Sequence, residues 1–372
     1  MSSVAEERGA APRRTRAPLR SHFTFSSRSE SIEVDDAPVV DVPDETVPLV
    51  GAIAFEADQP DALLAPEALR VALPTGRVTA RAAADLRARI VAEPGAAEYE
   101  RKVAAVVARI AEAIRSGDDL RKVVLARRLR VECEAPIDVD LLLARLRRDP
   151  EVTTFRIGHR SRAGEPTEWI GATPETLLDK RGDRVHSLPL AGSAPRSSEW
   201  SVDQAAAQGL LASAKDRTEH RLVVEHVLDT LAPWCSALNA SSTPILTGTS
   251  TVWHLGTRID GRLRDRDTPS LTLARALHPT PAVCGVPTAK ARALIADTEG
   301  TPRGLYAGAV GWSDGTGDGC WMVTLRCAEV RGATAILHAG AGLVASSVPR
   351  SEREETSAKF RALLDAFGVD EA

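Results

Sequence analysis

The sequence predicts an α+β fold, in which layered antiparallel or mixed sheets are flanked by helices in one large domain. Segments of strand and helix character come in mixed groups rather than in the strict alternation of a doubly wound sheet. A chain of 372 residues, with 43% hydrophobic and 26% charged residues, is long enough to bury a sizeable core. No linker divides residues 21–370, which we therefore expect to form one catalytic domain.

Composition and charge argue against several classes of protein. The formal net charge of −4 gives no sign of a nucleic-acid or membrane partner, and no run approaches the roughly 18 apolar residues of a membrane span. Five cysteines without a CxxC pair indicate reduced thiols, so we expect a cytoplasmic protein. Residues 1–20 carry arginines but no apolar stretch, which predicts a disordered leader rather than a signal peptide. A nucleic-acid-binding arm is the alternative.

In the first half of the chain, apolar alternation and short apolar runs predict strands, and helical spacing of apolar residues predicts helices. Residues 31–47 are acidic and dotted with proline, which indicates a loop, whereas residues 60–95 fit neither pattern. Gly117 supplies a stop for the first long helix. The predicted strands are 22–26, 48–55, 122–131, 153–157 and 169–170, and the predicted helices are 98–116 and 141–147.

The second half contains a long helical stretch at 202–231, which has no interior proline. Residues 314–319 look like a hairpin turn, and they lack the lysine and the strand–helix setting of a nucleotide-binding loop. The remaining predicted elements are strands at 251–255, 321–327 and 334–338 and an amphipathic helix at 352–367.

Two titratable residues stand beside apolar segments. Lys122 opens an apolar strand; most such lysines are solvated, but a buried, uncharged amine could accept a proton. Glu175 follows a proline turn and precedes two leucines. Such residues usually begin a turn or a helix, although an apolar site could keep the carboxyl protonated as a proton donor. The sequence alone leaves both alternatives open.

Carboxylates gather on two distant helical segments. Asp216, Glu219 and Glu225 lie in the long helical stretch, and Glu352 and Glu355 begin the last helix. Acidic residues in a first helical turn commonly complement the helix dipole. Two carboxylate groups from distant helices would also suit Mg²⁺, which takes one or two carboxylates together with water and substrate oxygens. On its own this signal is weak.

A run of small residues follows the strand predicted at 334–338. We expect residues 338–344 to form a turn, in which the amides of Gly340 to Gly342 could approach an anion. A tight turn that needs positive φ is an equally good explanation. Arg326, on a preceding strand, could pair with a carboxylate.

These segments, in this order, resemble the chorismate-utilising enzyme family over about residues 22–367. Each segment is weak evidence, but eleven in register are specific to the family. They are LVGAIAFE from Leu49, KVVLARRL from Lys122, IGATPETLL from Ile170, LPLAGSAPR from Leu188, KDRTEHRLVVE from Lys215, VWHLGT from Val252, LHPTPAVCGVP from Leu277, RGLYAGAVGW from Arg303, TLRCAEV from Thr324, HAGAGLV from His338 and EREETSAKF from Glu352.

The resemblance implies a reaction with water. Family members that use ammonia carry glutamine where this chain has Lys122, because water needs a base and ammonia does not. Aminodeoxychorismate synthases carry a nucleophilic lysine where this chain has Ala191. The implied enzyme is an isochorismate synthase, an isomerase, in which Lys122 takes a proton from water attacking C2 of the ring. Glu175 then donates a proton to the departing C4 hydroxyl.

The resemblance also implies the residues that hold the ligands. Glu219 and Glu355, with Glu352 nearby, would bind Mg²⁺, the one expected cofactor. The expected partner is the small-molecule substrate chorismate, and a monomer is the family-based expectation. The residues implied to bind the substrate are Ala191, Gly192, Ser193, His254, Thr257, His278, Tyr306, Arg326, Gly340, Ala341, Gly342 and Lys359.

Two positions depart from the pattern, and two other functions stay open. Cys320 stands where isochorismate synthases commonly have glutamate, and Cys284 stands where glycine or serine is usual. A salicylate synthase, which also eliminates pyruvate, shares Lys122, Glu175 and Ala191. A non-catalytic chorismate-binding homologue is the alternative from another class. Several segments look more like stand-alone isochorismate synthases of siderophore and menaquinone pathways.

Overall fold

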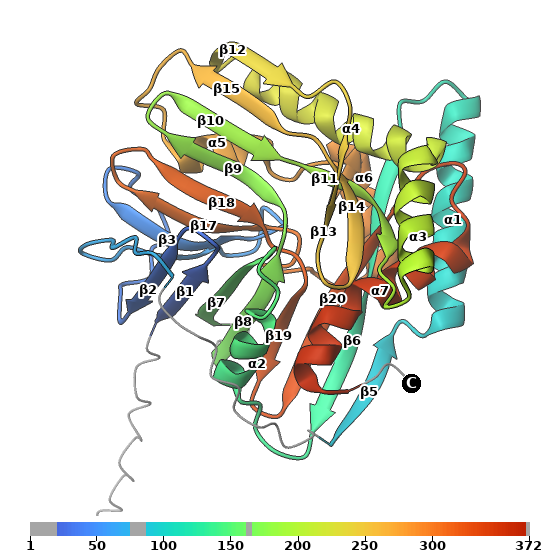
Figure 1. The fold of residues 1–372 in the computed structure, drawn as a ribbon, viewed down its shortest axis with the longest axis horizontal. Helices are drawn as coiled ribbons and strands as arrows, with labels where there is room; N and C mark the ends of the chain where they lie inside the picture. Colours follow the sequence, from blue (N-terminus) through green and yellow to red (C-terminus); the bar gives the residue numbers. More distant parts are fainter. Residues whose placement is uncertain (1–20, 75–86, 161–165, 370–372) are drawn as a thin grey trace, which may run out of the picture.

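The computed structural model describes residues 21–74, 87–160 and 166–369. The leader predicted at 1–20 lies outside the described residues. All strand pairs within the described residues are antiparallel, so the predicted α+β class is confirmed, and antiparallel rather than mixed sheets form its layers. Two large sheets and one small sheet are arranged with helices along their outer faces (Figure 1).

The first sheet has nine strands, and two neighbouring strands near one end of it, β6 and β20, line part of the site. Strands β6 and β20 pair over ten residues, from Thr334 opposite Glu132 to Leu343 opposite Val123. In spatial order the sheet contains β16 (Gly285–Val286), β6 (Lys122–Cys133), β20 (Thr334–Leu343), β19 (Cys327–Arg331), β8 (Pro166–Thr173), β7 (Thr153–Arg160), β1 (His22–Ser26) and β2 (Ser31–Asp35), and β5 (Ala88–Glu93) also pairs with β6.

The second sheet has eight strands and the third has three. The second contains, in order, β12 (Cys235–Ala240), β15 (Ile259–Leu263), β10 (Arg184–Leu188), β9 (Thr176–Arg181), β18 (Gly319–Val323), β17 (Ala309–Asp314), β3 (Pro48–Ile53) and β4 (Ala62–Leu64). The third contains β11 (Leu190–Pro195), β14 (Val252–Gly256) and β13 (Ile245–Gly248).

Apolar stripes on the helices cover these sheets. Helix α7, drawn in red in Figure 1, packs on β20 and on α1, and it buries Phe360, Leu363 and Phe367. None of the described helices is both long and apolar enough to span a membrane. The helices are α1 (Ala96–Arg115), α2 (Val139–Leu146), α3 (Trp200–Ala212), α4 (Ala214–Leu231), α5 (Ser270–Leu277), α6 (Thr288–Glu299) and α7 (Pro349–Phe367).

Several predicted boundaries are wrong, each for a local reason. The helix predicted at 202–231 is two helices, because Ser213 is extended at ψ 115° and its hydroxyl accepts from the Asp216 N–H, which caps α4. The strand predicted at 321–327 is interrupted by residues 324–326 between β18 and β19. The turn predicted at 338–344 is mostly the continuation of β20.

The first predicted loop is also partly wrong, and some elements carried no prediction. Residues 31–35 of the loop predicted at 31–47 form β2, which pairs with β1. Helices α5 and α6 and most strands of the second sheet were not predicted, because short apolar segments fit strand and helix equally well.

Candidate active site

An enclosed cavity lies where the first sheet, the third sheet, α4 and α7 meet. Val124 of β6 and Gly340 and Gly342 of β20 form one wall. The segment 190–193 of β11 and His254 of β14 form another. The first and third sheets therefore form facing parts of the lining, and α4 and α7 contribute Glu219, Glu355 and Lys359 to it.

Glu175 projects into this cavity from the connection between β8 and β9. Its side chain is 3% exposed, and burial raises its pKa from 4.5 to about 7, against the lowering effects of the Leu190 backbone, Lys122, Lys359 and Arg326. A carboxyl with such a pKa is partly protonated at neutral pH, so it can donate a proton.

Lys122 is fully buried at the start of β6. Its Nζ lies 3.0 Å from Oε1 of Glu219, but the angles are not those of a hydrogen bond, and the amine makes no other hydrogen bond with the described residues. The pair fits only because residue 342 is glycine. A Cβ there would lie 1.9 Å from Oε1 of Glu219 and 3.0 Å from Cε of Lys122.

Two more lysine–carboxylate pairs adjoin the first. Lys215 Nζ lies 2.7 Å from Oε1 of Glu352, and Lys359 Nζ lies 2.7 Å from Oε1 of Glu355. Burial raises the pKa of Glu352, and the neighbouring Glu355 raises it further. Burial would also raise the pKa of Glu355, but Lys359 and Lys215 hold it below its ordinary value.

The three carboxylates are chemically suited to a hard divalent cation. They offer oxygen ligands alone, and Oε2 of Glu352 is buried without a hydrogen bond, although Ser347 is close enough to lower the pKa of this residue. In the parts of the chain that the structure describes, no three His, Cys, Asp or Glu side chains are placed so that they could together hold a metal ion. Water and substrate oxygens would have to complete the coordination of Mg²⁺, which commonly keeps several waters.

Arg326 lies between β18 and β19 with φ +45°, a conformation that non-glycine residues rarely adopt. Its guanidinium donates to Oγ1 of Thr249 at 2.9 Å and to Nε2 of His254 at 2.5 Å. Burial holds the pKa of His254 well below its ordinary value, so the ring is neutral. Since Nε2 accepts from Arg326, Nδ1 carries the proton and donates to the carbonyl of Gly192 at 3.2 Å.

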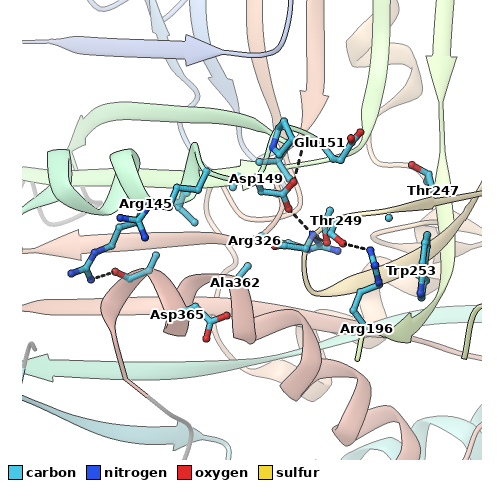
Figure 2. A pocket seen from close by; sticks show the side chains of 18 of the residues that line it. Arg145, Asp149, Glu151, Arg196, Thr247, Thr249, Trp253, Arg326, Ala362 and Asp365 are labelled. Carbon is cyan, nitrogen blue, oxygen red and sulfur yellow. Dashed lines mark hydrogen bonds between the residues drawn. The ribbon is translucent and has the colours of Figure 1, made fainter. Parts of the chain in front are cut away.

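A second, more open cavity of about 980 Å³ lies on the other side of Arg326 (Figure 2). Its walls include Arg145, Arg196 and Trp253, and Figure 2 shows Arg196 directed toward Thr249. None of the predicted catalytic and metal-binding residues lines it. Arg326 therefore separates the site of the proposed chemistry from a solvent-connected space.

The enclosed cavity brings together most of the predicted site residues. Lys122 and Glu352 are not in its lining, but each contacts the cluster through its ion pair. The predicted residues that line it are Glu175, Ala191, Gly192, Ser193, Glu219, His254, Tyr306, Arg326, Gly340, Gly342, Glu355 and Lys359.

Three residues predicted to bind substrate do not line the cavity. Ala341 alternates with Gly340 and Gly342 along β20, so its side chain points to the opposite face of the strand. Thr257 pairs with Nε2 of His220 at 2.6 Å. The ring of His278 contacts the Ala54 carbonyl through Nε2 at 3.1 Å, and burial lowers its pKa to about 4.

Sequence reasoning missed three residues of the site. Lys215 lies one helical turn before Glu219, a spacing that could have indicated it. Thr249 gave no signal, because its contact with Arg326 joins residues far apart in the sequence. His338 lines the cavity between the rings of Trp169 and Tyr306, at centroid distances of 5.6 and 5.0 Å.

Comparisons with known proteins identify the family of this chain. The family model described as "Chorismate binding enzyme" matches residues 53–368. The chain belongs to the chorismate-binding enzyme family. Within this family, MenF of Mycobacterium tuberculosis is 43% identical over 335 residues, which cover 87% of each chain. The isochorismate synthase DhbC of Bacillus subtilis is 41% identical over 87% of this chain and 81% of its own.

A solved structure of the chorismate-binding family shares the fold. DhbC from Bacillus anthracis has a TM-score of 0.86 and 36% identity, covering 94% of this chain and 96% of its own. The two cysteines that depart from the family pattern do not line the enclosed cavity. Both thiols are buried, which raises the pKa of Cys284 to about 11 and that of Cys320 well above its usual range. Neither is therefore a reactive thiolate at neutral pH.

Proposed function

We propose that this protein is an isochorismate synthase, which converts chorismate to isochorismate by adding water at C2 with loss of the C4 hydroxyl. Two observations on this chorismate-binding enzyme carry the proposal together: a glutamic acid whose pKa is about 7 lines the enclosed cavity, and a fully buried lysine contacts Glu219 of the same lining. The name of the relative from Bacillus subtilis, isochorismate synthase DhbC, supports the same reaction.

Lys122 and Glu175 perform the proton transfers in this proposal. The uncharged amine of Lys122 takes a proton from water as the water oxygen bonds to C2, and both ring double bonds shift toward C4 as the C4–O bond breaks. The carboxyl of Glu175 gives its proton to the C4 oxygen, which leaves as water. Lys122 ends as an ammonium and Glu175 as a carboxylate, and proton exchange with solvent resets both. Each transfer contributes on the order of 10²–10⁴ in rate.

Cationic groups around the cavity would hold the two carboxylates of chorismate. Arg326 presents a guanidinium whose orientation is fixed by Thr249 and His254, and Lys359 lines the same cavity. Glu219, Glu352 and Glu355 would hold Mg²⁺. The bound ion would supply positive charge for a substrate carboxylate and compete with Lys122 for Glu219.

Product analysis tests the proposal directly. The protein is incubated with chorismate in the presence of Mg²⁺ or of excess chelator, and the products are separated by chromatography. We expect isochorismate only with Mg²⁺. Prompt, stoichiometric formation of fluorescent salicylate would instead identify a salicylate synthase. Chorismate binding without turnover, across several divalent ions, would identify a non-catalytic homologue.

We also infer a monomeric, cytoplasmic enzyme that needs no macromolecular partner. All five cysteines are free thiols, and four of them are buried, which fits a reducing compartment. Size-exclusion chromatography with light scattering tests the monomer, for which the expected mass is 39.7 kDa.

A further inference from the structure

The predicted metal ligands are neutralised by lysines. Each of the three carboxylates has a lysine Nζ within 3.0 Å of one of its oxygens, so three negative charges face three positive charges. Asp216 adds a fourth carboxylate near the group, so the carboxylates outnumber the lysines by one. The pairs are Glu219 with Lys122, Glu352 with Lys215, and Glu355 with Lys359.

Lys215 differs from the other two lysines. Lys122 is fully buried in β6, and Lys359 also donates to the carbonyl of Gly340 at 2.8 Å. Among the described residues, Lys215 hydrogen-bonds only to Glu352, and its side chain is 25% exposed. Burial lowers the pKa of Lys215, but the charges of all three predicted metal ligands, Glu355, Glu352 and Glu219, raise it above its ordinary value. Lys215 is therefore held by one hydrogen bond, and its charge acts on all three carboxylates.

A divalent cation would disturb this balance. If Mg²⁺ joined the lysine-paired carboxylates of the free protein, the group would carry an excess of positive charge in a largely buried place. A substrate with two carboxylates would offset the two positive charges of the ion. The presence of Lys215 therefore penalises the metal alone and favours the metal together with a dianion.

We propose that Lys215 acts as an internal counter-ion that weakens metal binding to the free protein and makes it depend on the dianionic substrate. The second part of this inference rests on the proposed function, and the first does not. Thermodynamic linkage makes this coupling reciprocal. If the substrate raises the affinity for Mg²⁺ by some factor, Mg²⁺ raises the affinity for the substrate by the same factor. Lys215 is a positioning residue in this proposal, because it acts through Glu352 rather than on the reacting atoms.

Calorimetric titration of Mg²⁺ into the free protein at pH 8 tests the first part without any turnover. We expect Lys215→Met to bind Mg²⁺ about tenfold or more tightly than the unmodified protein, since one unscreened positive charge is removed beside the ligands. Lys215→Arg keeps the charge and should keep the weak affinity. Lys290→Met removes a lysine from an exposed ion pair with Asp118 and Asp119 and should change nothing.

The same titration with chorismate present tests the second part. In a Glu175→Gln background, where chorismate is expected to stay unconverted, chorismate should tighten Mg²⁺ binding about tenfold or more, and Lys215→Met should remove most of this effect. If Lys215→Met cannot be purified folded, Lys215→Gln removes the same charge and still offers an amide to Glu352.

Two results would overturn the proposal. One is an unchanged Mg²⁺ affinity in folded Lys215→Met or Lys215→Gln protein. The other is equally tight binding in Lys215→Arg, which would point to steric blockage rather than charge. A protein that shows the Lys215 effect with Mg²⁺ alone but does not convert chorismate would disprove the proposed function and leave the role of Lys215 intact.

Discussion

Oε1 of Glu219 lies 3.0 Å from Nζ of Lys122, so a predicted metal ligand touches the predicted base. If Glu219 also binds Mg²⁺, as proposed above, the ion would draw this carboxylate away from the amine of Lys122. Metal binding and proton transfer would then depend on one contact, which the glycine at position 342 makes possible.

Replacing Lys122 with glutamine should abolish turnover and leave the fold intact. The amide cannot accept the proton of water, and the loss should be about 10²–10⁴-fold in kcat. Chromatographic product assays measure the rate, and circular dichroism checks the fold. Lys290→Gln, at the surface, serves as the control and should keep full activity. Isochorismate formed at the unmodified rate by Lys122→Gln would refute the assignment of the base.

The rate should decline as the pH rises through about 7, because Glu175 then loses the proton that it must donate. The decline should appear in kcat against pH, measured in several buffers at saturating Mg²⁺. Glu175→Gln should be inactive at every pH in the range. A rate that stays level up to pH 9 would contradict the role of Glu175 as the acid.

The free energy of unfolding should also depend on pH through the ionisation of Glu175. The pKa of Glu175 is about 7 in the folded protein and 4.5 in the unfolded chain. Between pH 4.5 and about 7, the folded protein therefore holds a proton that the unfolded chain releases. The stabilisation is complete below about pH 4.5 and is lost as the pH rises through about 7, a change of about 3 kcal/mol at most. Denaturation of the Glu175→Gln variant at pH 5 and pH 8 supplies the comparison. Its stability relative to the unmodified protein should rise with pH; a constant difference would contradict the pKa.

Gly342→Ala should displace Glu219 and weaken both Mg²⁺ binding and turnover. The new Cβ would lie 1.9 Å from Oε1 of Glu219, so the carboxylate must move. Gly209→Ala is a matched control: this glycine is exposed within α3, and a Cβ there meets nothing within 4 Å. The control should keep its activity and gain roughly 0.5–1 kcal/mol of stability from helix propensity. Equal Mg²⁺ affinity in the two variants would argue against Glu219 as a ligand.

Arg326→Lys should raise KM for chorismate about 10–100-fold, with a smaller effect on kcat. The single ammonium of a lysine cannot keep the hydrogen bonds to Thr249 and His254 and also bind a carboxylate. Each hydrogen bond to a charged group contributes about 1.5–3 kcal/mol. Steady-state kinetics separate the two constants. Arg331→Lys, on the exposed end of β19, should leave both unchanged. An unaltered KM in Arg326→Lys would show that this guanidinium does not bind substrate.

Much of the site could be predicted because its residue types stand in a recognisable order along the chain. Lys122, Glu175, Glu219, Glu355 and Arg326 were each identified from their segments, and the structure gathers them around one cavity or its ion pairs. The long helices α1 and α7 and the strand β6 followed from periodicity, since their apolar faces are sustained over many residues.

The sequence by itself determined the family, the fold class and the residue types available for acid, base and metal chemistry. Only the tertiary structure decided which charges meet. The pairing of Lys215 with Glu352 spans 137 positions, and that of Arg326 with His254 spans 72, so no local pattern encodes either contact. Burial, which sets the pKa of Glu175, also depends on segments far apart in the chain. The chemistry of this site therefore arises from packing and the local electric field, and both exist only after the chain has folded.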